Sequence, residues 1–293
     1  ELENLTPLLA GTNSLSYWGN YNSDRIQGFD IGIKYKMELT NDLSLKVGSN
    51  LVVKSPKILQ KDEPNYPEKY QYRAGTATNS HWGLNAEGLY GADDFDALTG
   101  NLLSTLPVPS WGKVAPGDIK YVDTNEDGKI NSTDIHIIGQ QGANFQYSMY
   151  FNLKYKQFEL YALGIGYVGG NSMRTGDYYR PFGNAKKYPE HIKTAYSASN
   201  PDVDALYPRL TTTSSSHNNQ SSDFWMYNGN SFSIPTIQLT YNYIGKPKSV
   251  VKDLKIYLKG SNLIRYNANP TYANLSLSAP KSYSLNIGTI FSF

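Results

Sequence analysis

The stretch FDIGIKYKMEL at residues 29–39 decides the fold, because apolar and other side chains alternate along it without a break. Phe29, Ile31 and Ile33 begin the apolar face, and polar residues or glycine fill every second position between them. This period of two is typical of a β-strand with one face in apolar surroundings. After a tight turn at Asn41-Asp42, the same alternation recurs over residues 43–53, which predicts a hairpin.

The same pattern occurs in five further segments, so the chain has about seven strong strands. These segments cover residues 145–155, 158–164, 231–243, 252–264 and 283–293. Within 231–243 the apolar phase changes at Pro235-Thr236. A proline inside a strand is tolerated at a bulge or an edge, and we therefore expect a bulge there.

The predicted connections between the strands fall into two length classes that alternate along the chain. Residues 40–42, 156–157 and 244–251 are short connections, whereas 55–142, 168–222 and 265–281 are long and polar. If the last strand ends at the periplasmic side, every short turn lies on that side and every long loop lies outside. Short periplasmic turns and long extracellular loops are typical of outer-membrane β-barrels, whose strands need about 9–11 residues.

The composition agrees with this class and excludes several others. Tyrosine supplies 25 of the 293 residues, and only 18% are charged, against roughly 25% in soluble domains. Cysteine is absent, which excludes disulfide scaffolds, thiolate metal sites and cysteine nucleophiles. The net charge is +2 and no basic run exceeds Lys186-Lys187, so we expect no nucleic-acid partner. No apolar stretch approaches the ~20 residues of a membrane-spanning helix.

Two all-β architectures fit these observations. The favoured one is a transmembrane antiparallel β-barrel with long extracellular loops. Bacterial barrels are even-stranded, so about seven strands predict only part of a barrel. The alternative is a secreted, soluble β-sandwich that binds carbohydrate, in which the alternating strands turn their apolar faces inward.

Several motifs resemble one family, the SusC/RagA-type TonB-dependent outer-membrane transporters of Bacteroidetes. The strongest is PGDIKYVDTNEDGKI at residues 116–130, closing with IIG at 137–139. Further similar segments are WGLNAEGLY at 82–90, YKQFEL at 155–160, YPRL at 207–210, SDFW at 222–225 and IYLKGSNL at 256–263. Departures occur at Gln157, at 139–142 and at 233–237, where the family's glycine, proline and basic residues are missing.

The resemblance implies that residues 1–293 are the C-terminal portion of a 22-stranded transporter barrel in the cell outer membrane. It implies import of oligomeric nutrients, glycans or peptides, with a SusD-like surface lipoprotein as partner. The plug and the segment that engages TonB would belong to an N-terminal part outside this sequence. The other implied partners are the remainder of the same barrel and the lipid of the outer membrane.

Residues 123–134, within the segment 116–140, match the spacing of an EF-hand-type calcium loop. Oxygen-bearing residues occupy positions 1, 3, 5, 9 and 12, glycine occupies position 6, and position 7 would offer its carbonyl. The predicted ligands are Asp123, Asn125, Asp127, Lys129, Asn131 and Asp134. We expect a structural calcium ion, with magnesium as the other hard cation, that orders a long extracellular loop. The alternative is a solvated Asx-rich turn that binds nothing.

No arrangement of residues predicts an enzyme. The four histidines lack metal-ligand spacing, and the hydroxyl-rich run at 211–216 has no oriented base. Ligand or partner contact remains open for five loop aromatics, which could instead belong to the aromatic girdle or pack within the loops. They are Trp82, Tyr90, Trp111, Tyr178 and Tyr179.

Overall fold

The computed structural model describes residues 2–4, 18–175, 179, 190–212, 215–245, 252–270 and 282–292. The described chain is all-β, with five short 3-10 helices and a seven-stranded antiparallel sheet. No helix in the described ranges has the length and the apolar character needed to cross a membrane. The chain forms two compact units. The sheet unit comprises residues 27–55, 142–171 and 228–293, and the loop unit comprises 1–26, 56–141 and 172–227.

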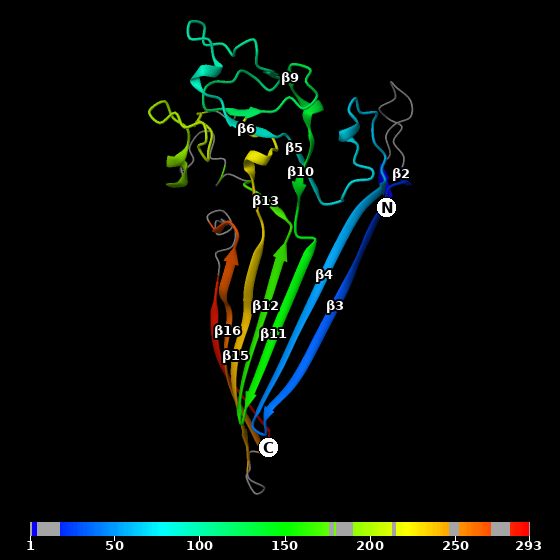
Figure 1. Cartoon of the computed structure of the whole chain (residues 1–293), viewed down its shortest axis with the longest axis vertical. Helices are drawn as coiled ribbons and strands as arrows, with labels where there is room; N and C mark the ends of the chain where they lie inside the picture. The colour runs from blue at the N-terminus through cyan, green and yellow to red at the C-terminus, as the bar shows by residue number, and fades with distance from the viewer. Residues whose placement is uncertain are drawn as a thin grey trace. The chain divides into compact units, whose positions relative to one another are not determined.

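The seven strands of the large sheet lie side by side in the order β17-β16-β15-β12-β11-β4-β3 (Figure 1). Their bounds are β3 (Ser23–Thr40), β4 (Leu43–Gln60), β11 (Phe145–Tyr155), β12 (Phe158–Val168), β15 (Ser231–Ile244), β16 (Asp253–Asn267) and β17 (Ser284–Ser292). All seven predicted strands are therefore confirmed. β3 and β4 extend further than the alternation predicted, because backbone pairing continues beyond the last alternating side chain.

The predicted bulge at Pro235 is also confirmed. The register of β15 against β16 shifts between Ile234 and Thr236, and that of β12 against β15 shifts between Leu163 and Ile165. Proline has no N–H to give to the ladder, so the shift is placed where that donor is missing. The apolar phase of the strand changes at the same point.

Glycine and tyrosine fit together across the sheet. A Cβ on Gly48 of β4 would lie 2.2 Å from Cε1 of Tyr150 on β11, and a Cβ on Gly288 of β17 would lie 2.3 Å from Cζ of Tyr257 on β16. The two tyrosine rings therefore lie across glycines of neighbouring strands. Rings held in this way help to fix the register of the sheet.

The strand connections confirm the predicted length asymmetry. The connections at one end of the strands are short, at residues 41–42, 156–157 and 245–252. The connections at the other end are long, at residues 61–144, 169–230 and 268–283. Because neighbouring strands are antiparallel throughout the sheet, short and long connections lie at opposite ends of the strands.

The loop unit contains the buried hydrophobic core of the described chain. Its centre includes Leu84, Ile119, Tyr121, Ile130 and Trp225, each at most 2% exposed. Short strands frame this core: β5 (Ser80–Gly83), β6 (Ala86–Leu89), β7 (Val108–Pro109), β8 (Ile119–Tyr121), β9 (Lys129–Ile130) and β10 (His136–Gln140). The other short elements are β1 (Leu2–Asn4), β2 (Trp18–Asn20), β13 (Asn171–Met173), β14 (Met226–Asn228), η1 (Lys69–Gln71), η2 (Ala92–Asp94), η3 (Ser132–Asp134), η4 (Glu190–Thr194) and η5 (Asp223–Trp225).

Candidate functional site

The apolar residues of the seven strands share one continuous face of the sheet. The register pairs Val47 of β4 with Phe151 of β11, and Leu160 of β12 with Leu239 of β15. Leu239 pairs in turn with Leu258 of β16, which pairs with Ile287 of β17. On this face Ile33 is 67% exposed and Ile287 is 79% exposed. Apolar surface of this extent marks a site of protein or membrane contact in a folded protein.

The opposite face of the sheet is polar and carries more basic than acidic side chains. Within the sheet unit, this face has four acidic residues, Asp30, Glu38, Glu159 and Asp253, and eight basic ones, Lys34, Lys36, Lys46, Lys54, Lys154, Lys255, Lys259 and Arg265. The balance on this face is +4, whereas the whole chain carries +2. The excess positive charge of the protein is therefore concentrated on one face of one sheet.

In the predicted cation loop, residues 123–134, the acidic side chains accept hydrogen bonds from backbone N–H groups of the same loop. Asp123 accepts hydrogen bonds from the N–H groups of Asp127 and Gly128 at 3.3 and 2.7 Å. Asp134 is fully buried and accepts from the N–H groups of Thr124 and Asn131, both at 2.8 Å. Gly128 has φ +81, a left-handed conformation that explains the glycine at the sixth position.

The remaining predicted ligands are held in the same manner. Asp127 Oδ1 accepts from the N–H of Lys129 at 2.8 Å, and Asn125 and Asn131 accept from Asp127 and Thr133. Within the described ranges, no three His, Asp or Glu side chains gather closely enough to hold a metal ion. The oxygen donors suit a hard cation in their chemistry, and their side chains are directed at backbone N–H groups in this conformation. Calcium at this loop therefore stays a prediction.

The acidic residues of the loop create a negative electrostatic potential that acts on neighbouring groups. Burial, followed by the charges of Glu68, Asp134, Asp123 and Asp127, raises the pKa of Tyr70 to about 12. The Tyr70 hydroxyl donates to the carbonyl of Thr133 at 2.8 Å, so η1 is fastened to the loop. A bound cation would neutralise part of this field.

The four predicted contact aromatics that the structure describes have separate surroundings. Tyr90 and Tyr179 are 1% and 7% exposed, so these two side chains are packed inside the protein. Trp111 is half-buried and packs against the core of the loop unit. Trp82 is half-buried with the Arg73 guanidinium 5.5 Å from its ring centre. Tyr178 lies outside the described residues.

The loop unit contains an ion pair between a buried carboxylate and a half-buried arginine that the sequence motifs did not indicate. Asp118 is 1% exposed and receives Nε of Arg209 at 2.7 Å and Nη2 at 3.1 Å. Asn218 and the N–H of Ala115 also donate to it, both at 2.8 Å. A buried carboxylate with four donors has its lone pairs satisfied, and the pair fastens segments 115–118 and 209–218 together. Sequence separations near 100 residues gave no local signal for it.

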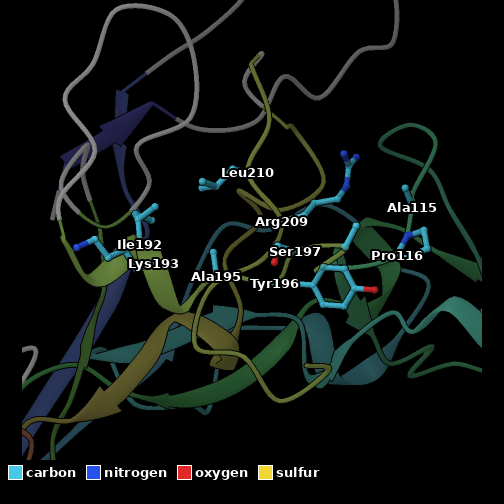
Figure 2. Close-up of a pocket in the computed structure, with 10 residues that line it drawn as sticks. Ala115, Pro116, Ile192, Lys193, Ala195, Tyr196, Ser197, Arg209 and Leu210 are labelled. Carbon is cyan, nitrogen blue, oxygen red and sulfur yellow. The ribbon is translucent and has the colours of Figure 1, made fainter. Parts of the chain in front are cut away.

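A hollow of about 610 Å³ adjoins this pair (Figure 2). Its walls are largely apolar and come from three segments, at 115–116, 192–198 and 209–210. The Tyr196 ring lies against Gly117, whose φ of +88 and closeness to the ring leave no room for a Cβ. The two basic side chains that line the hollow, Lys193 and Arg209, already pair with Glu190 and Asp118.

A second unpredicted feature is the clamp around Arg174. Its guanidinium lies 5.4, 5.4 and 5.2 Å from the ring centres of Tyr207, Phe224 and Trp225. It also donates to the carbonyls of Leu206 and Phe224. Cation–π contacts of this kind are strengthened by burial, and Arg174 is only 5% exposed. The motif residues Tyr207, Phe224 and Trp225 thus build the core of the loop unit.

Comparison with known proteins gives a curated relative and several solved structures. The relative is TonB-dependent receptor P3 from Formosa agariphila, 23% identical over 202 residues, which cover 68% of this chain and 18% of the receptor. The chain thus matches less than a fifth of that receptor's length. No protein-family model matches the chain.

The similar structures are those of the RagAB peptide transporter, each covering 92% of this chain. The first has a TM-score of 0.62 at 16% identity and is matched over 28% of its chain. The "open-open" state of the RagAB peptide importer scores 0.64 at 16% identity over 28%, and the "closed-closed" state scores 0.63 at 17% identity over 29%. The chain therefore has the fold of a segment of that transporter.

Proposed function

We propose, from the premise that this chain is a relative of the TonB-dependent receptors, that it forms part of the wall of a transporter barrel. Two predictions drawn from the motifs are confirmed: the resemblance to SusC/RagA-type transporters and the outer-membrane location. The similar proteins are a receptor and transporters, which fits the expectation that the chain is not an enzyme. The whole protein would be a TonB-dependent importer.

The exposed apolar face of the sheet is the observation that carries this proposal. The buried hydrophobic side chains among the described residues lie in the loop unit, whereas Phe29, Ile33, Leu285 and Ile287 of the sheet are each more than 50% exposed. Exposing such a face to water is unfavourable by about 25 cal/mol per Å² of apolar surface. Lipid on the apolar face and an aqueous lumen on the polar face remove this cost.

The long connections would then form the extracellular side. All three leave the strands at the same end, and two of them supply the packed loop unit. We assign to them the docking of a SusD-like surface lipoprotein. TonB would act through a part of the protein outside this chain. The remaining strands of the barrel would pair with the free edges of β3 and β17.

The cargo in this proposal is an oligomeric nutrient, either a glycan or a peptide. The solved relatives are peptide transporters, and the lumen-facing side of this sheet is rich in amides, hydroxyls and charges. Lumen residues of barrels tune which solutes pass.

The 123–134 loop has its own place in the proposal, as a structural site for calcium or magnesium. Its donor set is Asp123, Asn125, Asp127, Asn131 and Asp134, with the carbonyl of Lys129. Asp123 and Asp127 already sit on one turn closed by Gly128. A cation bound there would draw the three carboxylates together and stiffen a long extracellular connection.

Limited proteolysis of the full-length protein tests the cation site. We expect 1 mM calcium to slow cleavage between residues 116 and 140 by about tenfold relative to EGTA. The Asp123→Asn/Asp127→Asn variant should lose this protection, whereas Asp93→Asn, an exposed acid outside the loop, should keep it. Equal cleavage with calcium and with EGTA would leave the Asx-rich turn as the correct account.

Cell fractionation followed by an unboiled-versus-boiled gel tests the proposed function. We expect an outer-membrane band far heavier than 32.7 kDa whose mobility changes on boiling, as folded barrels resist detergent until heated. A soluble species of 32.7 kDa would contradict the proposal and favour the secreted β-sandwich with a calcium loop.

A further inference from the structure

The polar face of the sheet holds a hollow of about 510 Å³ that the proposed function leaves without a role. It lies over β12, β15 and β16 and is lined by polar side chains, two tyrosine rings and the aliphatic side chains of Leu163 and Ile290. The lining includes Glu159, Tyr161, Gln238, Lys255, Tyr257 and Lys259. All of them belong to the sheet unit.

The register explains why these residues meet. Tyr161 of β12 pairs with Gln238 of β15, and Gln238 pairs with Lys259 of β16. One row along the strands, Glu159 pairs with Thr240, and Thr240 pairs with Tyr257. Two successive rows of the polar face therefore form the floor of the hollow, and Lys255 adds a third.

The charges at the hollow are unbalanced in favour of cations. Lys255 and Lys259 make no ion pair with a carboxylate among the described residues. The acid, Glu159, accepts a hydrogen bond from Nδ2 of Asn152 at 2.5 Å, on the side of the hollow away from β16. Rings of Lys and Arg side chains select anions in membrane pores.

The rings point to a flat, polar ligand. Tyr257 lies across Gly288 of β17, where even a Cβ would approach Cζ to 2.3 Å, so the sheet supports one face of the ring. Gln238 and Thr240 lie on the neighbouring strand, where Nε2 of Gln238 donates to Oγ1 of Thr240 at 3.1 Å and Thr240 is only 8% exposed. An aromatic surface beside an amide suits a sugar ring, whose apolar face stacks while its hydroxyls hydrogen-bond.

The backbone argues against an extended peptide at this place. β12, β15 and β16 each pair with a strand on both sides, so the floor offers no free row of N–H and C=O groups. Recognition of a peptide as an added strand needs such an edge. Side chains alone would have to bind the ligand.

We infer that this hollow is a subsite for an acidic oligosaccharide, with Lys255 and Lys259 binding its carboxylates and Tyr257 stacking on a sugar ring. The inference rests on the proposed function, because the polar face must line a lumen. It narrows the cargo from glycans or peptides to glycans that carry negative charge.

Calorimetric titration of the full-length detergent-solubilised protein tests the inference, with trigalacturonate, maltotriose and a tetra-aspartate peptide as probes. We expect trigalacturonate to bind at least tenfold more tightly than maltotriose, and its affinity to fall as salt rises. Lys255→Gln/Lys259→Gln should weaken trigalacturonate about tenfold or more, and Tyr257→Leu should weaken it as well. Lys113→Gln, an exposed lysine of the loop unit, is the matched control and should bind as wild type does.

Three results would overturn the inference: no binding of trigalacturonate, equal binding of maltotriose, or the same loss in Lys113→Gln. Binding of tetra-aspartate alone would replace the glycan with an acidic peptide. A boiled-versus-unboiled gel of the same preparation separates the two levels of failure. A heat-modifiable barrel that binds no probe contradicts only the subsite, whereas the absence of a barrel contradicts the proposed function itself.

Discussion

At the scale of single residues, His217 shows how the loop unit keeps a titratable group in its core. The ring is 2% exposed, and Nε2 lies 2.7 Å from the carbonyl of Ile119. Tyr121 packs against it with ring centres 4.9 Å apart. Burial lowers the pKa of His217 below its ordinary 6.5; the Ile119 carbonyl and Asp118 oppose this shift, and Arg209 adds to it. The neutral imidazole is therefore the form that fits the folded unit.

This gives a pH dependence with a defined sign. Above pH 6.5 His217 is neutral in both folded and unfolded chains and has no effect on their balance. As the pH falls below 6.5, the unfolded chain takes up a proton that the folded one resists, so the loop unit loses stability. Hydrogen exchange over 215–225 should therefore accelerate from pH 7 to pH 5, by at most about tenfold per pH unit beyond the intrinsic rate.

His217→Gln keeps an N–H donor for the Ile119 carbonyl and removes the titration. It should flatten this pH dependence, whereas His136→Gln, in a half-buried histidine bound to the Asp134 carbonyl, should leave it unchanged. An identical pH profile in wild type and His217→Gln would show that another group controls the acid sensitivity.

At the scale of elements, the strands were the most predictable part of the molecule. The alternation in 29–39 and 145–155 is local information, since each side chain needs only its own neighbours to define a face. The bulge at Pro235 was also predictable, because a proline inside a strand is a local signal. The Asp118–Arg209 pair and the Arg174 clamp join residues far apart in sequence, so no local pattern could reveal them. The sequence left open whether Tyr90 contacts a ligand or packs within the loops, and its burial depends on contacts in a loop that packs its own core.

The pairing of glycine with tyrosine gives a prediction for one element. Gly288→Val should displace Tyr257 from β17 and destabilise the sheet by about 1–3 kcal/mol, the usual cost of overpacking. The measurement is the temperature at which the unboiled band converts to the boiled form, which should fall. Adding Tyr257→Ser should restore much of the loss, because the smaller side chain leaves room for the valine. A Gly288→Val protein with unaltered conversion temperature would contradict the fit of ring and glycine.

At the scale of the whole molecule, two faces of one sheet carry the functional argument. The sequence predicted both faces and the alternation of short and long connections, and the comparisons place the chain within the fold of a larger transporter. The hollow on the polar face could not be foreseen, because it depends on which rows of β12, β15 and β16 come into register. Whether the predicted cation loop binds a cation likewise depends on side-chain directions, which the spacing of the ligands does not fix.

In the proposed barrel wall, the apolar face of the sheet meets lipid and the polar face meets water. Phe151 and Asn152 are neighbours in the middle of β11 with side chains on opposite faces, and this chain contains no cysteine. Phe151→Cys and Asn152→Cys variants of the full-length protein, assayed in intact outer membranes with a membrane-impermeant maleimide, therefore test it directly. We expect labelling of Asn152→Cys and protection of Phe151→Cys until the membrane is dissolved and the protein unfolded. Rapid aqueous labelling of Phe151→Cys in the native membrane would contradict it.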